Sequence, residues 1–106
     1  MTHGTHNAIE DDRNEQIYIQ INGEYFQRND AKISVFDSGY LVGDGVWEAL
    51  RLHSGILVFS DEHWNRLWQG AATIGMNLPF GKRELEQRVM DTLQKNEMED
   101  GVHVRI

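Results

Sequence analysis

Residues 46–67 read VWEALRLHSGILVFSDEHWNRL and contain the clearest succession of structural signals in the chain. Residues 46–52 and 56–59 are rich in aliphatic, β-branched and aromatic side chains, which favour strands. Ser54 and Gly55 between them are typical of a turn, so the two segments are expected to form consecutive antiparallel strands. A helix is expected to follow directly.

This helix is expected to begin after Ser60, whose hydroxyl can accept a hydrogen bond from a free backbone N–H of the first turn. Phe59 and Trp64 stand at the positions of a hydrophobic staple, in which a residue before the helix packs against one in its first turns. Apolar side chains then recur at helical spacing, at Trp64, Leu67, Trp68, Ala71 and Ala72. The stripe predicts a helix face buried against a core or a partner domain.

Further β structure is expected upstream. Residues 16–21 (QIYIQI) and 24–28 (EYFQR) flank Asn22-Gly23, a dipeptide preferred in two-residue hairpin turns, so they predict a β-hairpin. Residues 32–36 (KISVF) also favour a strand. The first half of the chain is therefore expected to be mainly antiparallel β.

Downstream, residues 82–96 predict a second helix from apolar side chains at every fourth position, Leu85, Val89 and Leu93. Residues 102–106 (VHVRI) alternate as a strand does. These patterns predict an α+β domain in which an antiparallel sheet packs against two helices. Residues 1–15 are polar, lack periodicity and are expected to form a flexible tail, which leaves the domain to residues 16–106. Because the chain stops within a predicted strand, the domain is expected to be incomplete at its C-terminal end.

The composition excludes several classes of protein. The 106 residues carry a formal net charge of −7 and no cysteine. The acidic balance argues against nonspecific binding to nucleic acid, which needs clustered Lys and Arg. Without cysteine there is no disulfide, thiolate zinc site or thiol nucleophile. No segment resembles a membrane span or a signal peptide, so a soluble protein is expected, with the cytoplasm as its default location.

The histidines do not predict a metal site. His3 and His6 lie in the expected tail, where terminal histidines usually bind nothing specific. His53 and His63 lack the third ligand that a zinc site requires. They are expected to be ordinary polar residues, with His63 available to support a nearby site.

Gly39, Gly43 and Gly45 form a glycine-rich segment before the first strand of residues 46–67. Their spacing does not match the dinucleotide-binding fingerprint, and no Gly-Lys-Ser/Thr follows, so a nucleoside-triphosphate loop is not expected. Taken alone, they indicate a turn or bulge in which glycine permits positive φ or a close backbone approach.

Arg66 and His63 stand one turn apart on one face of the predicted helix. The guanidinium of Arg66 presents a planar fork of donors that suits a phosphate dianion. The ordinary alternative is a surface ion pair with Glu62, four residues earlier, which would contribute little to stability. The residues alone favour that ion pair.

Residues 37–48 (DSGYLVGDGVWE) and 61–67 (DEHWNRL) together resemble the signature of the fold-type IV pyridoxal-phosphate enzymes. This family contains the branched-chain and D-amino-acid aminotransferases and aminodeoxychorismate lyase. The shared pattern is an aspartate-glycine turn, Gly-Asp-Gly, an aromatic-Glu pair, and then Glu-His and Arg-Leu. The resemblance extends over residues 17–106 and implies the small N-terminal domain of a two-domain enzyme.

The resemblance implies pyridoxal 5′-phosphate as cofactor and two cofactor-binding residues in this chain. Arg66 would hold the phosphate, and Glu48 would make polar contacts around the cofactor unless it is only a strand-end carboxylate. The family's Schiff-base lysine lies in a later, C-terminal domain, and none of the chain's lysines, Lys32, Lys82 and Lys95, stands in its place. The chain alone is therefore expected to be inactive and to hold no catalytic residue.

The substrate-binding residues that the resemblance implies are Tyr40, Val42, Trp47 and Arg105. Branched-chain members often carry tyrosine where this chain has Val42, so the substrate class stays open. Trp47 is either a rigid wall of the pocket or a core residue. Arg105 is either a clamp for a substrate carboxylate or an exposed strand arginine.

The activity implied is that of an aminotransferase, which moves an amino group between an amino acid or amine and a 2-oxo acid. The implied assembly is a homodimer active in amino-acid metabolism, without nucleic-acid or membrane partners. An aminodeoxychorismate-type lyase is an alternative within the family. A different alternative is a non-catalytic module that binds a protein through exposed Trp64, Leu67 and Trp68.

Overall fold

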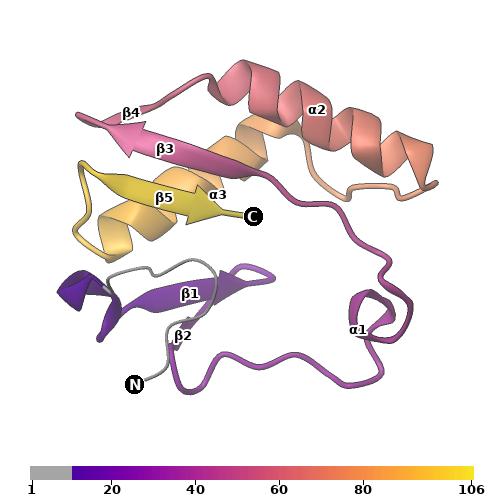
Figure 1. Cartoon of the computed structure of the whole chain (residues 1–106), viewed down its shortest axis with the longest axis horizontal. Helices are drawn as coiled ribbons and strands as arrows, with labels where there is room; N and C mark the ends of the chain where they lie inside the picture. The colour runs from indigo at the N-terminus through magenta and orange to yellow at the C-terminus, as the bar shows by residue number, and fades with distance from the viewer. Residues whose placement is uncertain (1–10) are drawn as a thin grey trace, which may run out of the picture. The chain divides into compact units, whose positions relative to one another are not determined.

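The computed structural model describes residues 11–106, and the chain divides into two compact units, Met1–Ala31 and Lys32–Ile106. Figure 1 shows the helices and strands of both units. The first ten residues, including His3 and His6, lie outside the described part of the chain. What was predicted for them therefore stays a prediction.

The first unit is built on the predicted β-hairpin, which is confirmed. Strand β1 (Tyr18–Ile21) pairs antiparallel with β2 (Glu24–Gln27). Asn22 and Gly23 join the strands with φ angles of 53° and 84°, the two left-handed conformations of a type I′ turn. The short 3-10 helix η1 (Asp12–Asn14) precedes β1, within the region predicted as a tail.

The strand predicted for residues 32–36 is not formed. Ile33, Val35 and Phe36 are exposed, and no strand in the described part of the chain pairs with this segment. The backbone N–H of Phe36 instead donates a hydrogen bond to the hydroxyl of Ser34. Branched and aromatic side chains stabilise a strand through packing on neighbouring strands, so their preference is not expressed here.

The second unit contains a three-stranded antiparallel sheet in the order β4-β3-β5. Strand β3 (Ala49–His53) is central, with β4 (Ile56–Leu57) and β5 (Val102–Arg105) at the edges. Leu50 and Leu52 of β3 are buried while the residues between and beside them are exposed. One face of the sheet therefore packs inward, and the three predicted strands are confirmed with shorter bounds.

Two helices complete the second unit. Helix α2 (Ser60–Thr73) packs against β3, and α3 (Lys82–Lys95) lies behind the sheet in Figure 1. Their inward faces contribute the buried side chains of Trp64, Leu67, Ala71, Leu85, Val89 and Leu93. The predicted helical stripes and the α+β class are thus confirmed. No helix within residues 11–106 has the length and apolar character needed to cross a membrane.

The beginning of α2 differs from the prediction. Phe59 is the N-cap residue, in a left-handed conformation with φ 55°, and no side chain caps the helix. Ser60 is already the first residue of the helix, and residues 58 and 59 form the turn between β4 and α2. The Phe59 side chain is exposed by this turn, so the predicted staple with the buried Trp64 does not form.

The apolar stripe of α2 is narrower than predicted. Trp68 is half-buried and meets the ring of Phe80 edge-on at 6.2 Å between centroids, and Ala72 is exposed. Trp64 and Leu67 are buried in the unit's own core. The exposed aromatic surface that a protein-binding module would need is therefore not present on α2.

Candidate functional site

A buried carboxylate next to β3 binds two side chains of α2, and we call Glu48, His63 and Arg66 the Glu48 cluster. Glu48 Oε2 accepts a hydrogen bond from Arg66 Nε at 2.7 Å, and Oε1 accepts one from Arg66 Nη2 at 2.7 Å. Oε1 also lies 2.6 Å from His63 Nδ1. The side chain of Glu48 is 6% exposed and that of Arg66 is 69% exposed. The arginine thus binds the carboxylate with its inner edge and presents its outer edge to solvent.

Backbone pairing at the end of the sheet holds Glu48 in place. Its N–H donates to the carbonyl of Ile106 at 2.9 Å, and the N–H of Ile106 donates to the carbonyl of Glu48 at 3.0 Å. These bonds extend the pairing of β3 with β5 by one residue. Because side chains alternate along a strand, Glu48 shares the inward face of Leu50 and Leu52 and meets α2 there.

The contacts within the Glu48 cluster keep its carboxylate ionised. Hydrogen bonds from Arg66, with a smaller contribution from His63, lower the pKa of Glu48 to about 2 against the opposing cost of burial. The carboxylate in turn raises the pKa of Arg66 above its ordinary value. Every buried side-chain nitrogen and oxygen in the described residues has a hydrogen-bond partner, so the cluster leaves no buried polar atom unsatisfied.

The ion pair of Arg66 with Glu62, which the residues alone favour, is replaced by the pair with Glu48. The sequence placed His63 and Arg66 on one face of the helix and singled out Glu48 separately, but it did not reveal that Glu48 meets both. Two signals pointed toward it: the one-turn spacing of His63 and Arg66, and the placement of a carboxylate in phase with the buried leucines of β3.

The outer edge of Arg66 can bind an anion. Two of the five guanidinium N–H donors go to Glu48. Nη1 and the second N–H of Nη2 have no partner within residues 11–106. Two parallel donors of this kind suit a phosphate or a carboxylate, and the buried anion behind them fixes their direction. The donor set therefore fits the phosphate group of a cofactor.

The glycine-rich segment forms the short helix α1 (Ser38–Val42) where a turn or bulge was expected. Asp37 caps it by accepting a hydrogen bond from the N–H of Gly39 at 2.8 Å. A Cβ on Gly39 would lie 2.9 Å from Asp37 Oδ1, so the close approach needs glycine. Gly43 ends the helix with φ 71°, so it shows the positive φ that was one of the two expected uses of glycine in this segment. Gly45 shows neither constraint.

Tyr40 and Val42, which were predicted to bind substrate, both belong to α1. Their side chains are exposed, and neither joins the Glu48 cluster. Figure 1 shows α1 on the segment that leads into β3, set apart from α2. The structure therefore does not bring these two residues together with Arg66.

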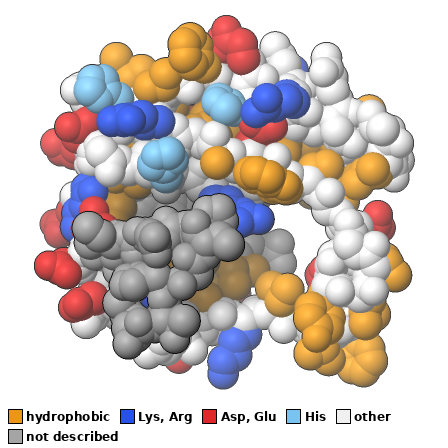
Figure 2. All heavy atoms as spheres, viewed as in Figure 1, with side chains coloured by type: hydrophobic (Ala, Val, Ile, Leu, Met, Phe, Trp, Pro, Cys, Tyr) orange, Lys and Arg blue, Asp and Glu red, His pale blue; other side chains and the backbone are white. Residues whose placement is uncertain are grey.

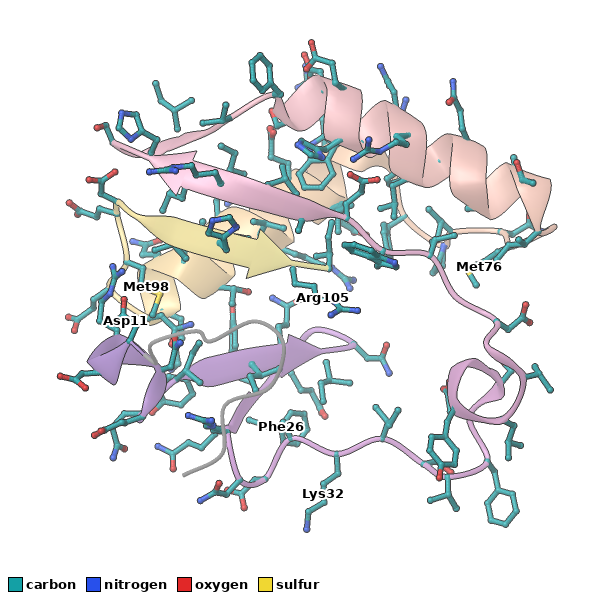
Figure 3. The ribbon with its side chains drawn as sticks, viewed as in Figure 1. Asp11, Phe26, Lys32, Met76, Met98 and Arg105 are labelled. Carbon is teal, nitrogen blue, oxygen red and sulfur yellow. The ribbon has the colours of Figure 1, made fainter. Side chains whose placement is uncertain are left out.

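Trp47 and Arg105, the other two predicted substrate-binding residues, contact each other. The guanidinium carbon of Arg105 lies 5.0 Å from the centroid of the Trp47 ring, within the range of a cation–π interaction. Figure 3 labels Arg105 near the C-terminal end of β5. Trp47 is 62% exposed, so it is not a core residue of this unit. The pair forms an exposed patch at the edge of the sheet where β3 begins and β5 ends.

The outward face of the sheet is basic, although the chain as a whole is acidic. Its exposed side chains include Arg51, His53, His103 and Arg105, with Arg51 directly opposite His103. Figure 2 shows Lys, Arg and His side chains gathered over this part of the molecule. No group of three or more potential metal ligands occurs in the part of the chain that is described.

The chain has clear relatives among known proteins. Residues 45–106 match the family model of amino-transferase class IV, and the chain belongs to this family. A Methanocaldococcus jannaschii protein provisionally named branched-chain-amino-acid aminotransferase is 39% identical over 82 residues, which cover 77% of this chain and 28% of that protein. D-alanine aminotransferase of Bacillus licheniformis is 37% identical over 83 residues, 78% of this chain and 29% of that enzyme.

Solved structures show the same fold. The branched-chain aminotransferase of Thermoproteus uzoniensis, solved with norvaline, superposes with a TM-score of 0.75 at 24% identity and covers 84% of this chain and 31% of its own. A second branched-chain amino acid aminotransferase, complexed with N-(5′-phosphopyridoxyl)-L-glutamate, also gives a TM-score of 0.75 at 24% identity, over 85% of this chain and 31% of its own. The chain spans less than a third of the length of these relatives.

Proposed function

We propose that the complete protein is a pyridoxal-phosphate-dependent aminotransferase and that this chain supplies its phosphate anchor. The observation that carries the proposal is the guanidinium of Arg66, bound on its inner edge to buried Glu48 and open on its outer edge. Membership of amino-transferase class IV and relatives named as aminotransferases support it. The substrates would be an amino donor and a 2-oxo acid.

The residues of this chain would bind and orient the cofactor. Arg66 would donate hydrogen bonds to its phosphate from Nη1 and Nη2, and these charge-assisted bonds are stronger than neutral ones. The cofactor, when bound, supplies the electron sink that lets an amino group be transferred. The lysine that holds the cofactor covalently would come from a C-terminal domain outside this chain.

Trp47 and Arg105 would form one wall of the substrate pocket. The indole ring offers rigid apolar area and also holds the Arg105 guanidinium over its face. From that position the guanidinium could bind the carboxylate of an acidic substrate. Tyr40 and Val42 would contribute from α1 in the complete enzyme, which we expect to be a homodimer of amino-acid metabolism in the cytoplasm.

Replacement of Arg66 tests the phosphate anchor. In the full-length protein, Arg66→Ala is expected to weaken equilibrium binding of pyridoxal phosphate by about 10- to 100-fold, since a hydrogen bond to a charged group contributes roughly 1.5–3 kcal/mol. Binding of pyridoxal, which lacks the phosphate, should change little. Arg83→Ala is the matched control, because Arg83 is an exposed arginine of α3 outside the cluster. Unchanged affinity for pyridoxal phosphate in Arg66→Ala would reject the proposed anchor.

A further inference from the structure

We infer that His63 is a positioning residue, which fixes Glu48 and through it the direction of the Arg66 donors that would hold the phosphate. The inference rests on the proposed function and gives a specific role to His63, which the sequence predicted only to be a polar residue available to support a nearby site. It also gives Glu48 a role as the support of Arg66, in place of the direct cofactor contact predicted from the resemblance.

The hydrogen bonds of Glu48 show why it supports the arginine. Oε1 accepts from both His63 and Arg66, and Oε2 accepts from Arg66. The carboxylate is almost completely buried, and its negative charge would repel a phosphate dianion. A group that is enclosed, ionised and already bonded at both oxygens is suited to orient a cation and unsuited to touch an anion.

His63 removes a motion that Arg66 alone leaves possible. The terminal torsion of a glutamate is soft, so a carboxylate held by one arginine can rotate together with its guanidinium plane. His63 reaches Oε1 from a different point of α2, at 2.6 Å from Nδ1. This third bond, with the backbone bonds between Glu48 and Ile106, fixes the carboxylate and the plane of the guanidinium.

The chemistry of the carboxylate decides which ring nitrogen carries the hydrogen. Ionised Glu48 can only accept hydrogen bonds, so His63 must donate from Nδ1. An asparagine at the same position carries its amide nitrogen where histidine carries Nδ1. Asparagine can therefore preserve this single hydrogen bond while it removes the rest of the ring.

Three variants of the full-length apo-protein test the inference by equilibrium binding of pyridoxal phosphate and of pyridoxal. His63→Ala is expected to weaken binding of pyridoxal phosphate by about 3- to 10-fold, the effect of losing one supporting hydrogen bond, and to leave pyridoxal affinity unchanged. His63→Asn is expected to restore most of the loss. His53→Ala, at an exposed histidine outside the cluster, should match the wild type.

Each other outcome overturns the inference. If His63→Ala binds pyridoxal phosphate as tightly as the wild type, Arg66 does not need the third bond. If both ligands lose affinity equally, or if asparagine does not restore binding, His63 acts only through general packing. Arg66→Ala in the same series separates the two proposals. If Arg66→Ala weakens binding of pyridoxal phosphate and His63→Ala does not, only the positioning role of His63 is rejected. If Arg66→Ala does not weaken it, the phosphate anchor itself is rejected.

Discussion

The two ends of residues 37–48 lie in opposite environments. Glu48 is enclosed by side chains of α2 and by the backbone of Ile106, whereas Tyr40 and Val42 on α1 are exposed to solvent. Both ends belong to one continuous motif of the family signature. The contrast teaches that the end at Glu48 is held by contacts within the second unit, whereas the side chains of Tyr40 and Val42 at the α1 end have no such packing.

The largest effect expected from this contrast is on stability. Leu52→Ala should lower the free energy of unfolding by roughly 2–5 kcal/mol, because Leu52 is 1% exposed and its removal leaves a cavity in the core of the second unit. Val42→Ala, at a side chain that is 75% exposed, should change it by less than about 0.5 kcal/mol. Urea unfolding of both variants provides the measurement, and similar losses would show that α1 is packed as tightly as β3.

Glu48→Gln sharpens the comparison through pH. The variant should lose roughly 1–3 kcal/mol of stability at neutral pH, because the Arg66 guanidinium no longer has a buried anion as its partner. The folded-state pKa of Glu48, about 2, lies below its ordinary value of 4.5, so the stabilisation is complete above pH 4.5 and is lost as the pH falls toward 2. The gap in unfolding free energy between wild type and variant should therefore narrow across this window. A difference in unfolding free energy that stays constant across this window would contradict the lowered pKa of Glu48.

Gly43→Ala tests whether α1 is itself ordered. An L-residue at φ 71° is strained, so the substitution should lower the free energy of opening of α1 by roughly 1–2 kcal/mol. Gly45→Ala is the matched control, since no atom lies within 4 Å of a Cβ added there and its φ is not positive. Hydrogen exchange of the Gly39–Gly43 amides would report the change, and equal behaviour of the two variants would show that α1 frays without a penalty.

The smallest effect is expected for Trp47 and Arg105. A double-mutant cycle with Trp47→Ala and Arg105→Ala should give a coupling energy of roughly 0.5–1 kcal/mol, typical of an exposed cation–π pair. Measured by urea unfolding, a coupling near zero would mean that the two side chains are held independently. Their pairing would then not support a shared pocket wall.

Where local rules act alone, the sequence predicted the fold well. Asn22-Gly23 specifies its turn from backbone preference, and the stripes of α2 and α3 follow directly from the helical period. The strand predicted for residues 32–36 was wrong, because a strand requires a neighbouring strand to pair with and a local sequence pattern does not show whether one is present. The start of α2 was also predicted one residue late, because the left-handed conformation of Phe59 at the N-cap has no signal in the sequence.

The sequence pointed to individual residues of the candidate site but not to the contacts between them. The resemblance pointed to Arg66 and Glu48, yet their ion pair depends on how β3 packs against α2, which sequence spacing does not encode. The same holds for Trp47 and Arg105, which are far apart in the chain and meet because β5 pairs with β3. Contacts between elements require the sheet order, and that order comes only from the three-dimensional structure.

The backbone bonds between Glu48 and Ile106 have a consequence for how the protein is made. Glu48 emerges from the ribosome well before β5, and until residue 106 is available its backbone N–H and carbonyl lack the partners seen in the folded unit. Pairings so distant in sequence form late, because a long loop must close first. The Glu48 cluster is therefore expected to become ordered only after the whole of residues 48–106 has been synthesised and β5 has paired with β3.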